Sequence, residues 1–399
     1  MRATSSGRDE LVATYLARPR GDPVRAAEAF ATGQSLGTWL PVPGITAEMR
    51  ARHGARVVEL RRLEPGELVS GELVEAPGAG GDDARLVRVA FATENFGPQF
   101  PMLLTTLLGA EPSTSIGARL VDVELSSAYA AAFPGPGHGA DGWRRLTGVA
   151  GRPLLLNMIK PCTGYPPEVG AGFVEAVARG GCDLVKDDEI LADAAFNRVA
   201  ERARAYRRRL ERVAEETGHR ARYLANVTTR PGRLLETAAA ALEGGADALM
   251  VSGLAVGLDA VQTLAEARLG VPLFVHNAGV ATFTAAPGAG LGRAVLLGRL
   301  LRLAGADAVL VNTSHGARPL ARELVEATVD RLRGPWHDFA PVMPVVGNGL
   351  TAEHVAPLVG EFGVEMILAV GGAIQGHPEG AVAGARAFRA AIDAAMMDR

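Results

Sequence analysis

From about residue 150 to the end of the chain, short apolar runs alternate with longer amphipathic stretches. Apolar runs of this length predict buried strands, and apolar residues spaced three or four apart predict helices that cover them. The predicted strands are Leu154–Ile159, Leu184–Lys186, Tyr223–Asn226, Ala248–Ser252, Leu273–His276, Ala308–Val311, Met343–Val346 and Met366–Val370. The predicted helices are Val169–Arg179, Phe196–Thr217, Gly232–Glu243, Leu258–Ala267, Gly290–Leu303, Leu320–Leu332, Ala352–Phe362 and Ala381–Ala395.

This alternation of strands and helices fits a (β/α)8 barrel, the TIM barrel. An open, doubly wound sheet is the alternative, but the regular spacing of the units favours closure. The triplets Gly181–Asp183, Gly245–Asp247 and Gly305–Asp307 each precede a predicted strand. Glycine at such a place is typical of a helix end. The predicted fold class is therefore α/β, with a barrel in the C-terminal part of the chain.

The first part of the chain has a different pattern, in which strands and helices do not alternate. We predict strands at Leu11–Leu16, Arg56–Leu63, Ala84–Ala92 and Ala118–Ser126, and helices at Asp22–Gly33 and Phe100–Leu108. This mixture predicts a smaller α+β domain over residues 1–135, before a barrel domain over residues 145–399. The Gly-, Pro- and His-rich segment Gly135–Gly142 is the predicted linker.

Composition narrows the cellular setting. The net charge of −3 gives no reason to expect binding to nucleic acid or to an anionic membrane. The only cysteines, Cys162 and Cys182, cannot form a disulfide framework, which fits a reducing compartment. The N-terminus has no apolar signal region, and no apolar run reaches the roughly 18 residues of a membrane span. We expect a soluble cytoplasmic protein.

The chain contains only two lysines, Lys160 and Lys186, among 41 basic residues. Each lies at the end of a predicted strand, where catalytic groups of (β/α)8 barrels gather. A lysine amine can lose its proton and act as a base, an acid or a nucleophile, whereas arginine cannot. We therefore predict that both lysines are catalytic. The alternative is that they are ordinary, partly buried ion-pair lysines.

The strand ends bring further polar residues to the same rim. They are Asp188, Glu189, Asn226, His276, Asn277, Asn312, Asn348, Gly349, Gly371 and Gly372. The carboxylates of Asp188 and Glu189 are oxygen ligands, which suit Mg²⁺ better than Zn²⁺. A solvated charge run is the other interpretation of Lys186–Glu189. It is less favoured because the run ends an apolar strand.

Four motifs together resemble the large subunit of RuBisCO, and more narrowly the RuBisCO-like proteins of form IV type. They are Pro153–Gly164 (PLLLNMIKPCTG), Gly180–Glu189 (GGCDLVKDDE), Gly37-Thr38-Trp39 and Gly371–Gly380 (GGAIQGHPEG). The resemblance runs in the expected order from about residue 10 to residue 385. The lysine followed by Asp-Asp-Glu is its most specific part.

The resemblance implies roles for individual residues. Lys186 would be carbamylated by CO2, and this N-carboxylysine would hold Mg²⁺ together with Asp188 and Glu189. Lys160 matches the family's acid/base lysine at the enediolate. His276 matches a histidine that contacts substrate hydroxyls. The alternative for His276 is a structural histidine with a backbone partner.

The same resemblance implies a phosphate site and a dimer. Phosphate would lie at the loops after the last two strands, near Gly349, Gly371 and Gly372. Thr38 and Trp39 would complete this site from a partner subunit, so we expect at least a homodimer. A turn and a core tryptophan are the competing interpretation of that pair.

Several positions depart from the pattern of a carboxylase. Asn277 stands where the family has a phosphate-binding arginine, although it remains a candidate substrate contact. Cys162 replaces the second lysine of the first motif. The loop Asn312–Pro319 holds His315 and Arg318 but no lysine. These departures imply a substrate with one phosphate and argue against ribulose-bisphosphate carboxylation.

We therefore predict a Mg²⁺-dependent lyase or isomerase that enolises a phosphorylated keto sugar or keto sugar acid, with or without decarboxylation. The alternatives are a 2,3-diketo-5-methylthiopentyl-1-phosphate enolase, a methylthioribulose-phosphate isomerase and a non-catalytic binding barrel. The family's enolases draw a further lysine from the N-terminal domain, and this chain has no third lysine. That absence counts against the enolase. Retention of the lysines and carboxylates counts against the non-catalytic barrel.

Overall fold

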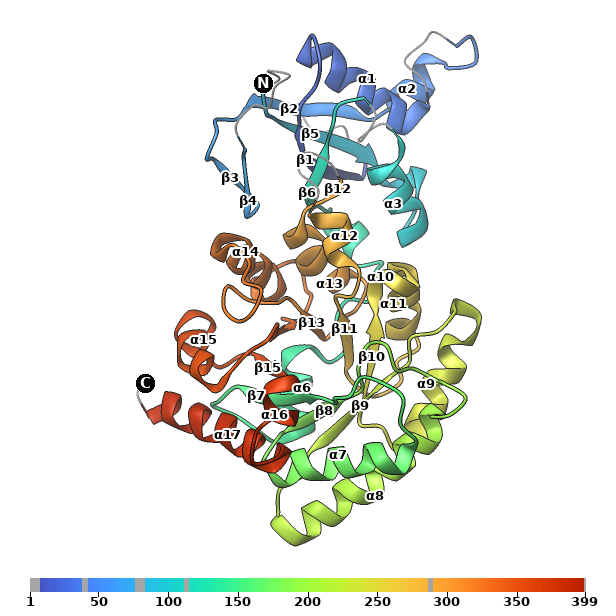
Figure 1. Cartoon of the computed structure of the whole chain (residues 1–399). Helices are drawn as coiled ribbons and strands as arrows, with labels where there is room; N and C mark the ends of the chain where they lie inside the picture. The colour runs from blue at the N-terminus through green and yellow to red at the C-terminus, as the bar shows by residue number, and fades with distance from the viewer. Residues whose placement is uncertain (1–7, 38–41, 76–82, 111–114, 286–289, 398–399) are drawn as a thin grey trace.

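The C-terminal part of the chain forms a closed barrel of parallel strands in a computed structural model (Figure 1). The structure describes residues 8–37, 42–75, 83–110, 115–285 and 290–397. The barrel strands, in order around the barrel, are β7 (Leu154–Met158), β8 (Leu184–Lys186), β9 (Arg222–Asn226), β10 (Ala248–Ser252), β11 (Leu273–His276), β13 (Ala308–Leu310), β14 (Met343–Val346) and β15 (Ile367–Val370). β15 pairs with β7 and closes the ring. The predicted barrel is confirmed.

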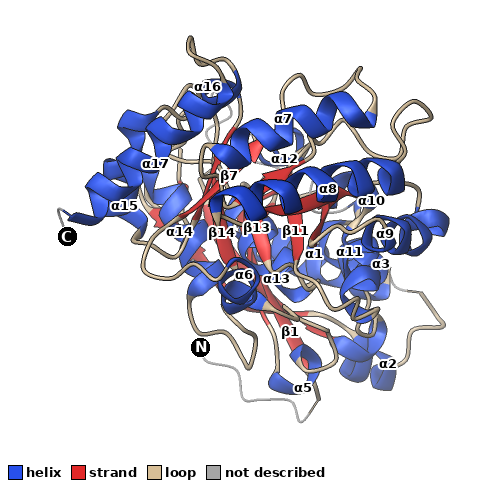
Figure 2. Ribbon diagram, turned by 90° about the horizontal axis from the view of Figure 1, so that it is seen from below, coloured by secondary structure: helices blue, strands red, loops and turns tan. Residues whose placement is uncertain are grey.

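Helices surround these strands, as Figure 2 shows in blue around red. The longer ones are α7 (Pro167–Arg179), α8 (Val199–Thr217), α9 (Leu234–Glu243), α11 (Leu258–Glu266), α14 (Arg322–Arg333), α15 (Val355–Phe362) and α17 (Ala381–Met397). Short helical segments are η2 (Pro231–Arg233), α10 (Gly253–Val256), α12 (Val280–Thr284), η3 (Val295–Leu300), α13 (Leu301–Leu303), η4 (Ala352–His354) and α16 (Gly372–Gln375). The predicted helix Gly290–Leu303 is wrong at its start, because Gly290–Leu291 form strand β12 and helical structure follows Gly292.

The barrel interior is filled by apolar side chains, and helix α6 (Gly139–Thr147) packs against the end of the barrel where the strands begin. Trp143 on this helix is fully buried against the strand residues that point inward. The predicted linker Gly135–Gly142 is therefore only partly a linker, since α6 begins inside it. Asp307, just before β13, accepts hydrogen bonds from the backbone N–H groups of His138 and Gly139 at 2.7 and 2.6 Å. The domain limits 1–135 and 145–399 remain a prediction.

Replacing Trp143 with alanine should destabilise the protein by about 3–5 kcal/mol, because it opens a large cavity where the barrel is closed. Chemical denaturation of W143A, compared with the unaltered protein, measures this loss. A W143A variant as stable as the unaltered protein would show that α6 does not support the barrel.

The N-terminal part forms a mixed sheet in the order β12-β6-β1-β5-β2. Its strands are β1 (Glu10–Ala17), β2 (Arg56–Arg62), β5 (Arg85–Ala92) and β6 (Arg119–Glu124). Its helices are α1 (Pro23–Leu36), α2 (Ala47–His53), α3 (Phe100–Leu108) and α5 (Ser127–Ala130), with the short turn η1 (Thr93–Asn95). The side chain of Asp22 caps α1 by accepting from the N–H groups of Val24 and Arg25. The predicted α+β domain is confirmed.

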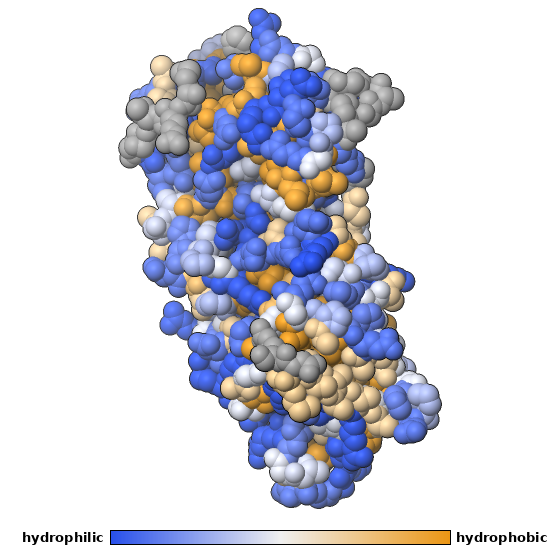
Figure 3. All heavy atoms as spheres, turned by 90° about the vertical axis from the view of Figure 1, so that its left-hand side faces the viewer, coloured by the Kyte–Doolittle hydropathy of each residue, from blue (hydrophilic) through white to orange (hydrophobic). Residues whose placement is uncertain are grey.

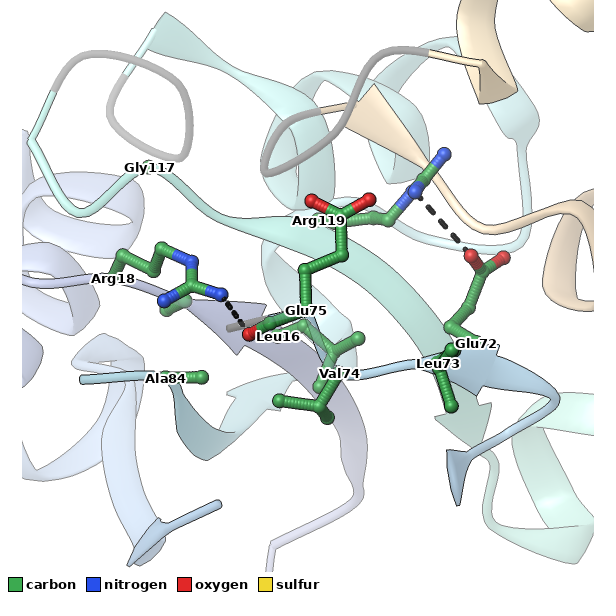
Figure 4. A pocket seen from close by; sticks show the side chains of 10 residues that line it. Leu16, Arg18, Glu72, Leu73, Val74, Glu75, Ala84, Gly117 and Arg119 are labelled. Carbon is green, nitrogen blue, oxygen red and sulfur yellow. Dashed lines mark hydrogen bonds and ion pairs between the residues drawn. The ribbon is translucent and has the colours of Figure 1, made fainter. Parts of the chain in front are cut away.

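The two parts of the chain are joined by more than the connecting segment. β12, contributed by the barrel part, pairs with β6 of the N-terminal sheet (Figure 1). The hairpin of β3 (Leu68–Val69) and β4 (Glu72–Leu73) adds an ion pair between Glu72 and Arg119 at 3.3 Å (Figure 4). Glu72 also accepts from the backbone N–H of Arg293, at 3.0 Å. One carboxylate therefore links the hairpin, the sheet and the barrel part.

No helix in the described ranges is both long and apolar enough to cross a membrane. Figure 3 shows one side of the molecule, where hydrophilic residues cover much of the surface and apolar ones gather in several places, including a pale-orange patch in the lower half.

Candidate active site at the carboxyl ends of the barrel strands

Lys186 is the last residue of β8 and is fully buried. Leu184, two residues earlier, belongs to the apolar barrel interior, so strand alternation directs Lys186 to the same side. Its Nζ donates to the backbone oxygen of Asp187 at 2.8 Å and lies 3.9 Å from Glu189 Oε2. Burial lowers the pKa of Lys186 more than the nearby carboxylates raise it. This shift sets the buried amine of Lys186 apart from an exposed lysine.

Lys160 follows β7 and reaches across the rim to Asp188. Its Nζ lies 2.5 Å from Asp188 Oδ2 and 3.0 Å from Cys162 Sγ. Burial alone would lower the pKa of Lys160, but the hydrogen bonds to Asp188 and Cys162 raise it. Burial has the opposite effect on Asp188 and raises its pKa. The hydrogen bond from Lys160 outweighs burial, so the pKa of Asp188 is lowered overall. The two groups form a charged pair at the rim, beside Lys186.

His276 ends β11 and faces the same carboxylates. Its Nδ1 accepts from the backbone N–H of Ala278 at 3.1 Å, which leaves the ring proton on Nε2. Nε2 lies 3.5 Å from Glu189 Oε2. Burial, reinforced by Lys186, lowers the pKa of His276 to about 3, so the ring is neutral. His276 thus has the backbone partner of a structural histidine and also a free N–H directed at the site.

The remaining candidates lie on the loops after β11, β14 and β15. Asn277 donates to Asn312 Oδ1 at 2.9 Å, which joins the loops after β11 and β13. Gly349 has a positive φ of 73°, and a Cβ there would lie 2.6 Å from Ala317 Cβ. A Cβ on Gly371 would lie 3.3 Å from Lys160 Cε. Gly371 therefore lies against the side chain of Lys160.

A Cβ on Gly372, the first residue of α16, would meet no atom within 4 Å. The backbone there is open to a ligand. Thr38 and Trp39 lie outside the described residues.

The sequence alone assigns no role to Asp187, Asn226 or Arg202. The side chain of Asp187 pairs with Arg202, at 2.9 Å, and only its backbone oxygen contacts Lys186. Asn226 Nδ2 donates to the backbone oxygens of Asp188 and Glu189, both at 3.1 Å. The two-residue period of a strand could have shown that Asp187 points away from Lys186 and Asp188. Nothing in the sequence pairs Asp187 with Arg202.

The side chains at the rim supply enough oxygen ligands for a cation such as Mg²⁺ only if Lys186 is carbamylated. The described part of the chain has no group of three His, Cys, Asp or Glu side chains that could hold a metal. Asp188 and Glu189 supply two carboxylates. The buried amine of Lys186 lies 3.9 Å from Glu189 Oε2, and both carboxylates act on it electrostatically. A carbamate on Lys186 would supply a third oxygen ligand, which is the chemistry that Mg²⁺ prefers.

The fold and the rim define a (β/α)8-barrel protein with two lysines and two carboxylates at its mouth. Residues 140–399 match the family described as "Ribulose bisphosphate carboxylase large chain, catalytic domain". The chain belongs to this family. Its similarity to RuBisCO-like relatives places it among the RuBisCO-like enzymes and not among the true carboxylases. The predicted resemblance is confirmed.

Two curated relatives are each 38% identical to the chain. The "Ribulose bisphosphate carboxylase-like protein" of Archaeoglobus fulgidus matches over 96% of this chain and 86% of its own. The "2,3-diketo-5-methylthiopentyl-1-phosphate enolase" of Geobacillus thermodenitrificans matches over 98% of this chain and 93% of its own.

Solved structures show the same fold. A RuBisCO-like protein (MtnW) from Alicyclobacillus acidocaldarius has a TM-score of 0.87 at 34% identity, covering 98% of this chain and 95% of its own. A dimeric archaeal RuBisCO from Hyperthermus butylicus has a TM-score of 0.87 at 29% identity, covering 100% of this chain and 93% of its own. The second of these neighbours is thus a dimer by its own description.

Proposed function

We propose that the chain is a Mg²⁺-dependent enzyme that enolises a phosphorylated keto sugar or keto sugar acid with a single phosphate, with or without loss of CO2. The observation that carries this proposal is the buried Lys186 beside Asp188, Glu189 and Lys160. Lys186 as its carbamate, Asp188 and Glu189 would hold the metal. When bound, Mg²⁺ would supply a positive charge that stabilises a developing enolate oxygen.

The chemistry of Lys186 supports this ligand set. A neutral amine attacks the carbon of CO2 through its nitrogen lone pair. An N–C bond forms as one C=O π bond opens onto oxygen, and a nitrogen proton passes to water or a buffer base, which gives a carbamate anion. Only a neutral amine can do this, and burial favours that form of Lys186. The carbamate then carries a negative charge in place of the buried amine.

Lys160 is the proposed acid/base group. Its Nζ lies at the rim next to Asp188, and while the two are paired Lys160 is an ammonium that can donate a proton. Ligation of Asp188 to a metal would remove that pairing, and the freed amine could then take the proton of a substrate carbon beside the carbonyl. Cys162 and Asp188 hold the amine in place. The N–H on His276 Nε2 is suited to donate to a substrate hydroxyl, because its other ring nitrogen is already occupied.

The phosphate of the substrate is proposed to lie on the backbone of Gly349, Gly371 and Gly372. Of the three, Gly372 best supports this proposal, because no atom lies within 4 Å of its Cβ position and an anion could approach its backbone. Asn277 offers an amide where an arginine would bind a second phosphate, which supports a substrate with one phosphate. Thr38 and Trp39 are proposed to complete the site from the partner subunit of a homodimer. An active monomer in sedimentation experiments would contradict these two roles.

A second candidate is the 2,3-diketo-5-methylthiopentyl-1-phosphate enolase reaction. Relatives that carry this name are 33–38% identical to the chain over nearly its full length. This chain, however, has no third lysine to match the one that the family's enolases draw from their N-terminal domain. Sequence identity to these relatives favours the enolase reaction. The absence of a third lysine favours a reaction on a different keto-sugar phosphate.

A substrate panel in D2O separates these reactions. Keto-sugar phosphates, keto sugar acid phosphates and the diketo-methylthiopentyl phosphate are each incubated with enzyme, Mg²⁺ and bicarbonate. Deuterium incorporation without loss of mass indicates enolisation or isomerisation, and CO2 release indicates decarboxylation. If no member of the panel exchanges deuterium or releases CO2, the proposed activity is wrong and a binding barrel remains.

A further inference from the structure

Asp187 faces away from the barrel interior, into the gap between the strands and helix α8. Its Oδ2 accepts from Arg202 Nη2 at 2.9 Å, from the hydroxyl of Tyr223 at 2.7 Å and from the backbone N–H of Asn226 at 2.9 Å. Asp187 and Arg202 are both fully buried. A buried ion pair therefore lies directly behind Lys186 and Asp188.

Arg202 uses all of its hydrogen-bonding directions at this place. Nε donates to the Tyr223 hydroxyl at 3.1 Å. Nη1 donates to the backbone and side-chain oxygens of Asn197, at 2.8 and 3.0 Å. Nη2 donates to Asp187 and also to the backbone oxygen of Ala192, at 3.1 Å. One side chain thus ties the end of β8 to the loop that returns to α8.

The backbone between these anchors carries Asp188 and Glu189. Its middle is fixed by Asn226 Nδ2, which donates to the carbonyl oxygens of both residues. Its far end is fixed by Asp193, whose Oδ1 accepts from the N–H of Val199 at 3.0 Å. The segment has no helix and only an isolated bridge between Ala194 and Asn197. A few backbone bonds, such as Leu191 N–H to the oxygen of Asp188 at 3.1 Å, and the side-chain bonds described here define its course.

We propose that Arg202 is a positioning residue that holds the backbone of Asp188 and Glu189 in the geometry needed to bind a divalent cation. This inference rests on the proposed function of the rim. Mg²⁺ requires near-octahedral ligands at short distances, so small shifts of the two carboxylates weaken binding. Lysine cannot replace Arg202, because a single ammonium group does not reproduce a planar fork of five donors.

The test compares R202K with R302K. Arg302 is also fully buried and donates only to backbone oxygens, those of Arg331, Gly334, Phe339 and Ala340, at 2.7–3.1 Å. R302K therefore removes a comparable set of hydrogen bonds far from the rim. Calorimetric titration with Mg²⁺ in bicarbonate buffer should show binding about 10- to 100-fold weaker in R202K and unchanged in R302K.

Hydrogen–deuterium exchange provides a readout that does not need the metal. Peptides covering residues 187–198 should exchange faster in R202K, whereas the same peptides in R302K should not. If the unaltered protein binds no Mg²⁺, the proposed function fails, and exchange alone decides the role of Arg202. Unchanged exchange over 187–198 together with unchanged Mg²⁺ binding would overturn the inference.

A milder variant covers the case in which R202K does not fold. Y223F removes only the hydroxyl that bridges Arg202 Nε and Asp187 Oδ2. It should weaken Mg²⁺ binding and speed exchange over 187–198 in the same direction as R202K. A folded Y223F protein that matches the unaltered protein in both measurements would contradict the proposal.

Discussion

Replacing Lys186 with methionine is expected to abolish the response to CO2 and Mg²⁺ and to lower turnover at least about a thousandfold. The loss corresponds to about 4 kcal/mol of transition-state stabilisation, a size typical of a metal that stabilises an enolate. Steady-state kinetics on the substrate found in the panel, with Mg²⁺ and bicarbonate present, measure it.

The same variant should not be less stable in the absence of metal and CO2. Lys186 is fully buried, and methionine of similar volume avoids the cost of burying an amine. The melting temperature of K186M should therefore equal or exceed that of the unaltered protein. Mg²⁺ with bicarbonate should raise the melting temperature of the unaltered protein and leave that of K186M unchanged. A K186M enzyme that keeps its activity would exclude the carbamate mechanism.

Replacing Lys160 with methionine is expected to slow exchange of the substrate α-proton by about 100- to 10,000-fold, because the acid/base group is removed. Exchange into D2O, followed by mass spectrometry, measures this rate. K160R is the matched control for charge. It keeps a cation beside Asp188 but cannot give up its proton, so it should be as slow as K160M.

Lys160 and a bound metal would both use Asp188, which gives K160M a second signature. In the structure Lys160 Nζ already lies 2.5 Å from Asp188 Oδ2. Removing this amine frees the carboxylate, so K160M should bind Mg²⁺ at least as tightly as the unaltered protein while losing proton exchange. Loss of Mg²⁺ binding in K160M would show that Lys160 supports the metal site and would contradict the separate roles of the two lysines.

The barrel could be predicted from the sequence because its strands are short, fully buried apolar runs. β8, β10, β11 and β14 have the predicted bounds without change. Gly290–Leu291 precede an apolar stretch of helical period, so local pattern predicts a helix there. In the structure β12 pairs with β6, about 170 residues earlier in the chain. Such a long-range contact cannot be predicted from the pattern of neighbouring residues.

The sequence predicts which residues lie in the candidate site, but it does not predict the hydrogen bonds between them. Strand ends of a parallel barrel must share one rim, and this brings Lys160, Lys186 and Asp188 together. The sequence did not reveal that Lys160 pairs with Asp188, since both ends of that bond depend on side-chain conformation. Nor did it reveal Arg202, which lies on a helix with many other arginines and is distinguished only by its burial.

Binding of ¹³C-labelled CO2, followed by ¹³C NMR in the presence of Mg²⁺, tests the central claim most directly. The account predicts one carbamate resonance per chain in the unaltered protein, absent from K186M and retained in K160M. The absence of such a resonance, or its persistence in K186M, would contradict it.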